Sequence, residues 1–264
     1  AWTPGVYQGA PTPVTAFMAA ATKAAAAAAL ARLLYLALFG MAWEIAPVLW
    51  TVAIATMLLG TVVAIVQTDV KRMLAYSSIA HAGFLLVALT SFRGDALAAV
   101  PFYMLAYGLA TLGAFAVVSQ VRERTPDGAL GAEATRLGQW TGLGRRAPWL
   151  ASAMALFLLS FAGIPLTAGF IGKFVVFKAA IDAGAWPLVL VAVLASAAAA
   201  FFYVRLIVLM FLTPVPPELE ESIEVSNATG PWLVMVVAAA GTILLGVLPS
   251  PVLDLAHQAA ILVP

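Results

Sequence analysis

Long runs of apolar residues alternate with short polar or helix-breaking stretches along the chain. A helix needs roughly 20 apolar residues to cross the hydrocarbon core of a bilayer, which is about 30 Å thick. Seven stretches approach or exceed that length, at residues 14–39, 46–67, 72–91, 97–121, 148–180, 186–212 and 231–248. The pattern predicts an all-α, polytopic membrane protein with seven transmembrane helices.

The stretches between the apolar runs divide the chain into four parts. Residues 1–13 contain three prolines and predict a loop that leads into the first helix. Residues 14–121 contain helices one to four. Residues 122–147 form a polar connecting segment with five Arg and three acidic residues, which is long enough to hold a surface helix and is expected on the cytoplasmic side. Residues 148–264 contain helices five to seven.

The fifth apolar stretch is too long for one straight crossing. Its 33 residues would make a helix of about 50 Å at 1.5 Å per residue. Its middle, residues 160–169, contains Gly163, Pro165 and Gly169, which loosen the chain and remove one backbone donor. We therefore predict a broken helix at residues 160–169. Interrupted transmembrane helices commonly line ion paths, although a proline kink that serves packing alone is the alternative.

The composition excludes several classes of function. Of the 264 residues 64% are hydrophobic and 9% are charged, and a formal net charge of +1 leaves no basic surplus to bind nucleic acid. The chain has no cysteine, which excludes disulfides, iron–sulfur ligation and thiolate zinc sites. Its two histidines, His81 and His257, are too few for a cytochrome that ligates several haems. We expect no cofactor in this chain.

The distribution of basic residues predicts the orientation in the membrane. Seven basic residues fall on one side of the predicted bundle: Lys71, Arg72, Arg122, Arg124, Arg136, Arg145 and Arg146. The other side has Arg93 and Lys178. Because the richer side is expected to be cytoplasmic, we predict a multi-pass protein with Ala1 on the cytoplasmic side and Pro264 on the opposite side; the bacterial inner membrane as its location is implied only by the family resemblance given below.

Two lysines lie within the apolar runs. Lys23 lies nine residues into the first predicted helix, roughly 13 Å deep, among alanines. A charged lysine at the centre of a bilayer costs at least about 2.5 kcal/mol on the insertion scale, so such residues are rare and mark function by default. Lys173 follows Pro165 by eight residues in an apolar setting. We predict that both lysines exchange protons. A fixed ion pair for Lys23 and snorkelling to the interface for Lys173 are the alternatives.

His81 falls near the middle of the third predicted helix. Imidazole titrates near neutral pH and suits a proton relay, although a neutral histidine bonded to a helix carbonyl is an equal alternative. Ser77 and Ser78 precede His81 by one turn, where their hydroxyls can extend a water wire or bond their own backbone. Tyr103 and Tyr107 share a helix face, a spacing that is more typical of packing than of chemistry.

Three stretches of the sequence resemble a known family. They are WTPGVYQGAPTPV at residues 2–14, DVKRMLAYSSIAHAG at residues 69–83 and LSFAGIPLTAGFIGKF at residues 159–174. Together they closely resemble the subunit N family of the proton-pumping NADH:quinone oxidoreductase, respiratory complex I. The chain is similar, more loosely, to the sister subunits of that complex and to the multi-subunit sodium/proton antiporters. The resemblance runs through essentially the whole chain, in order.

The resemblance implies a fold and a set of residue roles. Family members have fourteen transmembrane helices built around two inverted repeats, and this chain resembles helices eight to fourteen, the C-terminal half. Lys23 matches a lysine thought to connect two half-channels, His81 matches a histidine of the relay, and Lys173 matches a lysine near the outlet. A glutamate and a further lysine of the family's charged row belong to the other half.

The resemblance also implies a function. The chain would translocate protons through Lys23, His81 and Lys173, with repulsion between neighbouring lysines helping each proton to leave. NADH oxidation and quinone reduction, with their flavin and iron–sulfur clusters, would take place in partner subunits. The expected partners of this chain are other membrane-arm subunits, the lipid bilayer, water and protons. A subunit of a cation/proton antiporter and a membrane scaffold fragment are the alternatives.

Overall fold

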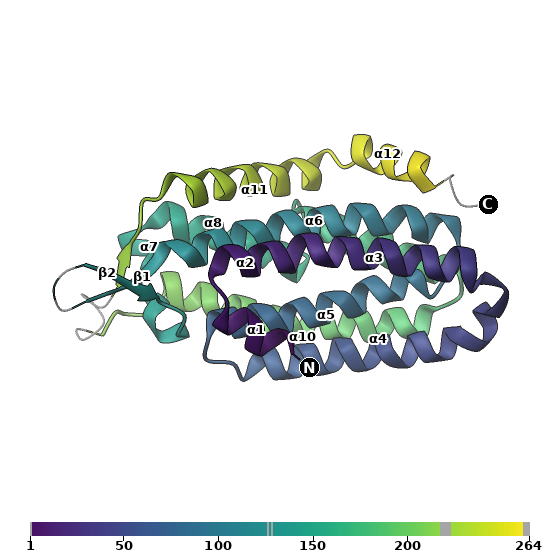
Figure 1. Cartoon of the computed structure of the whole chain (residues 1–264), viewed down its shortest axis with the longest axis horizontal. Coiled ribbons are helices and arrows are strands. Elements are labelled where there is room, and N and C mark those ends of the chain that lie inside the picture. Colours follow the sequence, from purple (N-terminus) through teal and green to yellow (C-terminus); the bar gives the residue numbers. More distant parts are fainter. Residues whose placement is uncertain (1, 126, 128, 217–222, 261–264) are drawn as a thin grey trace.

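The computed structural model describes residues 2–125, 127, 129–216 and 223–260, so Ala1 and Pro264 lie outside the described residues. Its long helices run along one axis and form an elongated bundle (Figure 1). The α-helices are α1 (Thr3–Gly9), α2 (Thr12–Phe17), α3 (Lys23–Arg32), α4 (Ala42–Ile65), α5 (Val70–Leu89), α6 (Gly94–Gln120), α7 (Leu143–Arg146), α8 (Pro148–Ala162), α9 (Ala168–Asp182), α10 (Trp186–Phe211), α11 (Thr229–Val247) and α12 (Ser250–Ala260). The π-helical turns η1 (Met18–Thr22) and η2 (Leu33–Ala37) follow α2 and α3.

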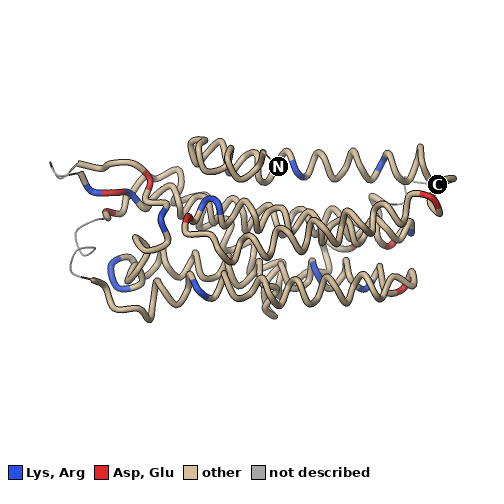
Figure 2. Tube along the Cα trace, turned by 90° about the horizontal axis from the view of Figure 1, so that it is seen from below, with Lys and Arg blue, Asp and Glu red and all other residues tan. Residues whose placement is uncertain are grey.

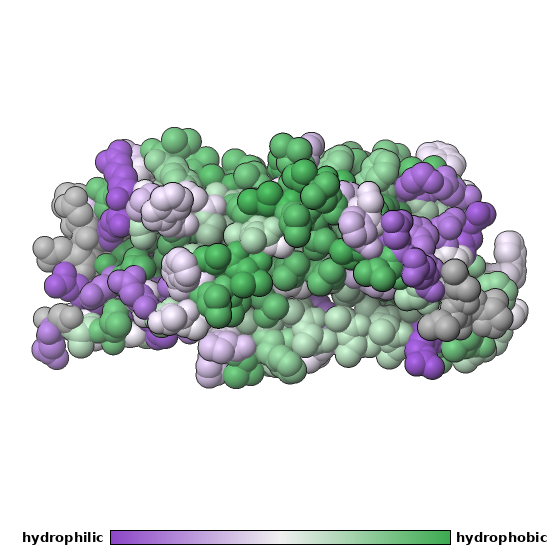
Figure 3. All heavy atoms as spheres, turned by 90° about the horizontal axis from the view of Figure 1, so that it is seen from above, coloured by the Kyte–Doolittle hydropathy of each residue, from purple (hydrophilic) through white to green (hydrophobic). Residues whose placement is uncertain are grey.

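Six helical runs among the described residues are long and apolar enough to cross a membrane: Thr12–Ala37, Phe39–Ile65, Val70–Leu89, Gly94–Gln120, Trp186–Phe211 and Thr229–Val247. The fifth predicted segment is divided between α8 and α9. Apolar side chains cover the middle of the surface and hydrophilic ones gather toward its two ends (Figure 3). The chain is therefore an all-α, multi-pass membrane protein, which confirms the predicted class.

The start of the chain differs from the predicted loop. Residues Thr3–Gly9 form helix α1, with Pro4 in its first turn, and α2 begins at Thr12 with Pro13 in its first turn. A proline in the first turn of a helix loses no hydrogen bond and already has a helical φ angle. The prolines that suggested a loop therefore start two short helices, and the prediction of a loop is wrong for Thr3–Gly9.

The connecting segment (residues 122–147) contains strands rather than the surface helix considered above. Strand β1 (Val121–Arg124) pairs with β2 (Leu130–Glu133) and with β3 (Ile223–Val225) in an antiparallel sheet of order β2-β1-β3. The turn η4 (Leu137–Trp140) and the four-residue helix α7 follow. Because β3 is about a hundred residues away from β1 along the chain, local sequence pattern does not reveal this pairing.

Helix α6 lies at the centre of the bundle. Its apolar window is 83% buried, against 28% for the first run, because α2, α5, α8, α9, α11 and α12 all pack against it. Neighbouring helices α4 and α5 approach closely through Gly60 and Gly83. A Cβ atom at Gly60 would lie 2.6 Å from the backbone nitrogen of Ala80, and one at Gly83 would lie 2.9 Å from that of Met57. Small residues of this kind allow membrane helices to pack backbone against backbone.

The predicted helix break is present between α8 and α9. Helix α8 ends at Ala162, and Gly163 adopts the left-handed region with φ +84. The backbone N–H of Ile164 donates to the carbonyl of Leu159 at 3.0 Å, which closes the end of α8 in a Schellman-type cap. A Cβ atom at Gly169 would collide with the carbonyl oxygen of Ser160. The two glycines therefore let the chain turn and let α9 start directly against the end of α8.

We expect Gly163→Ala to lower the free energy of unfolding by about 1–2 kcal/mol, because an L-residue is strained in the left-handed region. Thermal or denaturant unfolding of the purified protein in detergent measures this change. Gly230→Ala is the matched control, since a Cβ atom at Gly230 meets nothing within 4 Å. Equal stability of the two variants would contradict this account of the break.

Candidate functional site

Lys173 lies on α9 and fills the gap left by the helix break. Its Nζ atom donates to the carbonyl oxygens of Phe161 at 2.7 Å and Ala162 at 3.0 Å. A third bond, also of 2.7 Å, reaches the Oγ atom of Ser196 on α10. Gly163 leaves room for the stem of this side chain, since a Cβ atom there would lie 3.0 Å from the Cδ atom of Lys173. The predicted break and the predicted lysine therefore form one structural unit.

The end of α8 is a suitable site for an ammonium group. The last carbonyls of a helix have no helical partner, and they carry the negative end of the helix dipole. An ammonium group has three donors, and the three bonds of Lys173 use all of them. The residue is 6% exposed and forms no ion pair within the part of the chain that the structure describes. Neutral oxygens thus take the place of a carboxylate.

Lys23 begins α3 directly after the π-helical turn η1. π-Helical turns are rare in proteins, and many of those that occur lie at functional sites. The half-buried side chain reaches α5, where its Nζ atom donates to both the hydroxyl and the carbonyl oxygen of Ser78. It also lies 5.3 Å from the ring centroid of Tyr107. Among the described residues Lys23 has no carboxylate partner, so the predicted alternative of a fixed ion pair finds no support there.

His81 is buried between two tyrosine hydroxyls. Its Nδ1 atom lies 2.7 Å from the hydroxyl of Tyr103 on α6, and its Nε2 atom lies 3.3 Å from the hydroxyl of Tyr203 on α10. The Tyr203 hydroxyl also shares a hydrogen bond with Ser77. The two predicted serines therefore contact different groups. Ser77 bonds Tyr203, which also contacts His81, whereas Ser78 bonds Lys23. Both hydroxyls contact side chains of other helices.

Two cavities adjoin His81. One of about 260 Å³ is lined by Lys23, His81, Tyr107 and apolar residues, which makes it large enough for several water molecules. The other, of about 10 Å³, is lined by His81, Ser160 and Gly169 among others and has room for about one water molecule. The structure thus places the three predicted residues in one row. The larger cavity joins Lys23 to His81, and the smaller one extends from His81 to Phe161 at the end of α8, whose carbonyl binds Lys173.

Sequence reasoning missed several contributors to this row. Tyr203 and Ser196 lie seven residues apart on the same buried face of α10, and polar residues at that spacing in an apolar helix were the available signal. The spacing of Tyr103 and Tyr107 favoured packing over chemistry, yet the Tyr103 hydroxyl bonds His81. The sequence pattern could not predict that the carbonyls of Phe161 and Ala162 accept hydrogen bonds from Lys173, because they are free to do so only through the conformation of the break.

Residues 1–199 match the family described as NADH:quinone oxidoreductase/Mrp antiporter, TM. The chain belongs to this family. One relative is a protein of Beutenbergia cavernae named NADH-quinone oxidoreductase subunit N. It is 61% identical to this chain over 261 residues, which cover 98% of this chain and 49% of that protein. The predicted resemblance to subunit N is thereby confirmed. The chain spans about half the length of the curated relatives it matches.

Solved structures of family members have the same fold. A chain of respiratory complex I from Thermus thermophilus is 37% identical with a TM-score of 0.79, covering 96% of this chain and 53% of that chain. A chain of the Mrp complex from Dietzia has a TM-score of 0.82 at 22% identity, over 99% of this chain and 55% of that one, and the likeness shows the fold alone. Both structures are of multi-subunit complexes.

We expect Ser196→Ala to lower the free energy of unfolding by about 1–3 kcal/mol, because one donor of the buried Lys173 ammonium loses its acceptor. Unfolding in detergent measures the change. Ser152→Ala on α8 is the matched control, since Ser152 is exposed and its hydroxyl forms no hydrogen bond with a described residue. The assignment is wrong if both variants unfold at the same midpoint.

Proposed function

We propose that this chain is part of a proton-translocating membrane-arm subunit of an NADH:quinone oxidoreductase. The observation that carries the proposal is the row of Lys23, His81 and Lys173, in which both lysines bond neutral oxygens. A lysine in a buried ion pair is held in its charged form, because losing the proton leaves a carboxylate unpaired. Lys23 and Lys173 leave no such charge behind when they lose a proton.

The row suggests a route for the proton. From Lys23 the proton passes through water in the 260 Å³ cavity to His81, whose ring is held by Tyr103 and Tyr203. From there it passes through the smaller cavity beside Ser160 to Lys173. Each charged lysine repels a proton on its neighbour, so loading one site favours release from the next.

We also propose how the bundle is oriented in the membrane and which proteins surround it. The end of the bundle that carries the connecting segment faces the cytoplasm, which follows from the excess of Lys and Arg there. The neighbours of this chain are other membrane-arm subunits, in keeping with the multi-subunit complex to which the Thermus relative belongs. Flavin, iron–sulfur clusters and quinone belong to those partner subunits, and the described residues hold no group of His, Asp and Glu suited to a metal.

A cation/proton antiporter subunit is the second candidate, because the fold also matches a chain of an Mrp complex. The two candidates differ in what drives transport. An antiporter subunit exchanges protons for sodium in vesicles without NADH, whereas the proposed subunit moves protons only while NADH is oxidised. The 61% identity to a protein named subunit N favours the first candidate.

We expect Lys23→Ala or Lys173→Ala, introduced into the complete gene that encodes this chain, to lower NADH-driven proton translocation at least about tenfold, because a positioned proton-transfer group is lost. Acidification of membrane vesicles per NADH oxidised measures the effect, at equal amounts of assembled complex. Lys178→Ala is the control, since Lys178 is exposed and pairs with Asp182. Full proton translocation in both single variants would rule out the proposed roles.

We also expect Tyr203→Phe to slow proton translocation several-fold, because the hydroxyl that joins His81 to Ser77 is removed while the ring stays. The same vesicle assay measures it. Tyr76→Phe is the matched control, because the hydroxyl of Tyr76 forms no hydrogen bond with a described residue. A rate unchanged by Tyr203→Phe would remove Tyr203 from the route.

A further inference from the structure

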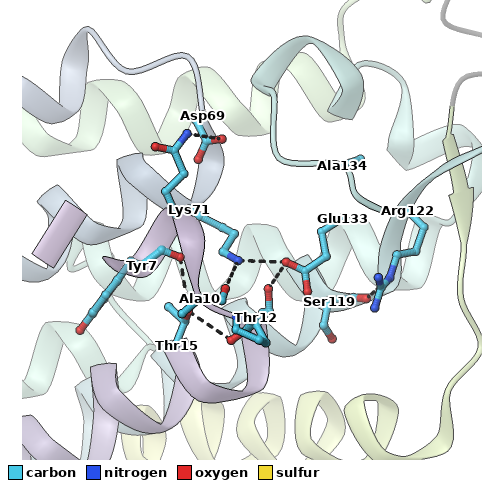
Figure 4. A network of polar contacts seen from close by, with 12 residues as sticks. Tyr7, Ala10, Thr12, Thr15, Asp69, Lys71, Ser119, Arg122, Glu133 and Ala134 are labelled. Carbon is cyan, nitrogen blue, oxygen red and sulfur yellow. Dashed lines mark hydrogen bonds and ion pairs between the residues drawn. The ribbon is translucent and has the colours of Figure 1, made fainter. Parts of the chain in front are cut away.

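An ion pair between a buried lysine and a half-buried glutamate joins α5 to the connecting segment (Figure 4). Lys71, in the first turn of α5, is 2% exposed, and its Nζ atom lies 2.9 Å from an Oε2 oxygen of Glu133 on β2. The same ammonium donates to the carbonyl of Ala10 at 2.7 Å, and the Thr12 hydroxyl donates to the same Glu133 oxygen. One carboxylate thus joins α5, the start of α2 and the connecting segment.

Backbone bonds fix the position of Glu133. The N–H of Val70 donates to the carbonyl of Thr135 at 2.7 Å, and the N–H of Leu137 donates to the carbonyl of Thr68 at 2.8 Å. Asp69, between them, forms a β-bridge with Arg136. The residues that follow Glu133 are therefore attached to the loop before α5, and the carboxylate has little freedom to move away from Lys71.

The carboxylate is ionised at neutral pH. Burial alone would raise the pKa of Glu133, but the hydrogen bonds from Thr12 and Lys71 and the charge of Lys71 outweigh burial and lower the pKa below its usual range. A group with a lowered pKa is a poor carrier of protons at neutral pH and a good fixed charge. The geometry agrees, because the Oε2 oxygen of Glu133 is held by both the Thr12 hydroxyl and the Lys71 ammonium.

The two helices joined by this network are the two that meet at Lys23 and Ser78. Thr12 begins the helical run that contains Lys23, eleven residues or about 16 Å further along. Lys71 precedes Ser78 by seven residues, about 10 Å or two turns of α5. The run that contains Lys23 is only 28% buried, so packing alone holds it less firmly than it holds α6. A slip of α2 along α5 would therefore separate Lys23 from Ser78.

We propose that Glu133 is a positioning residue for the proton route, which holds Thr12 and Lys71 so that Lys23 stays in contact with Ser78. This inference rests on the proposed function. It assigns the connecting segment a task beyond joining two helices, since the sheet presents one carboxylate to the start of the route. Glu133 does not exchange the translocated proton.

The test is Glu133→Gln, which keeps the shape of the side chain and removes its charge, in the complete gene and the assembled complex. We expect proton translocation per NADH oxidised to fall roughly two- to thirtyfold. Glu44→Gln is the matched control, because Glu44 is exposed and has no ion pair among the described residues. If Glu133→Gln prevents assembly, Thr12→Val removes only the hydroxyl and is expected to give a smaller loss in the same direction.

A double-variant comparison separates positioning from simple stability. If Glu133 acts through the Lys23–Ser78 contact, Glu133→Gln causes no further loss in a Ser78→Ala background. Losses that multiply in the double variant would overturn the inference, as would unchanged translocation in both Glu133→Gln and Thr12→Val.

Lys23→Ala run in parallel distinguishes failure of the inference from failure of the proposed function. If Lys23→Ala abolishes translocation while Glu133→Gln leaves it intact, the positioning role alone is wrong. If Lys23→Ala and Lys173→Ala both leave translocation intact, the proposed function itself fails.

Discussion

Hydrocarbon offers no hydrogen bonds, so every backbone carbonyl inside a membrane needs a donor from the protein or from enclosed water. Helix α8 ends at Ala162 within the bundle, and its last carbonyls are satisfied by the ammonium of Lys173. The broken helix and the buried lysine therefore depend on each other. Without the break Lys173 would lack two of its three acceptors, and without Lys173 the end of α8 would be exposed to an apolar interior.

The same arrangement, a titratable side chain bonded to neutral partners, recurs along the bundle. Lys23 bonds the hydroxyl and carbonyl of a serine, and His81 bonds two tyrosines. Buried groups of this kind are tolerated because neutral partners stabilise them without fixing their charge. The ion pair of Lys71 with the half-buried Glu133 lies instead beside the sheet. Under the proposed function, fixed charge and exchangeable charge thus occupy different parts of the molecule. Acidic residues gather toward the two ends of the molecule, whereas basic residues also occur between them (Figure 2).

The sequence was enough to predict the helices, the break and the three titratable residues, because membrane thickness sets helix length and charge at depth is costly. It was not enough to find Tyr203 or Ser196, since their role comes from α10 packing beside α5 and α9. The strands of the connecting segment were missed for the same reason, as β1 pairs with β3 from a distant loop. Helix α12 was missed because it is too short to cross a membrane.

The lack of carboxylate partners for Lys23 and Lys173 among the described residues also bears on ion selectivity. When both lysines are protonated, the interior holds positive charge that no nearby acid offsets. A sodium ion entering the cavity beside Lys23 would meet repulsion and a lining of mostly apolar side chains with few oxygens to replace its hydration shell. A proton avoids that barrier once one of the lysines is neutral, because it then becomes part of that side chain. If the chain works as proposed, this arrangement favours hydrogen ions over metal cations of the same charge.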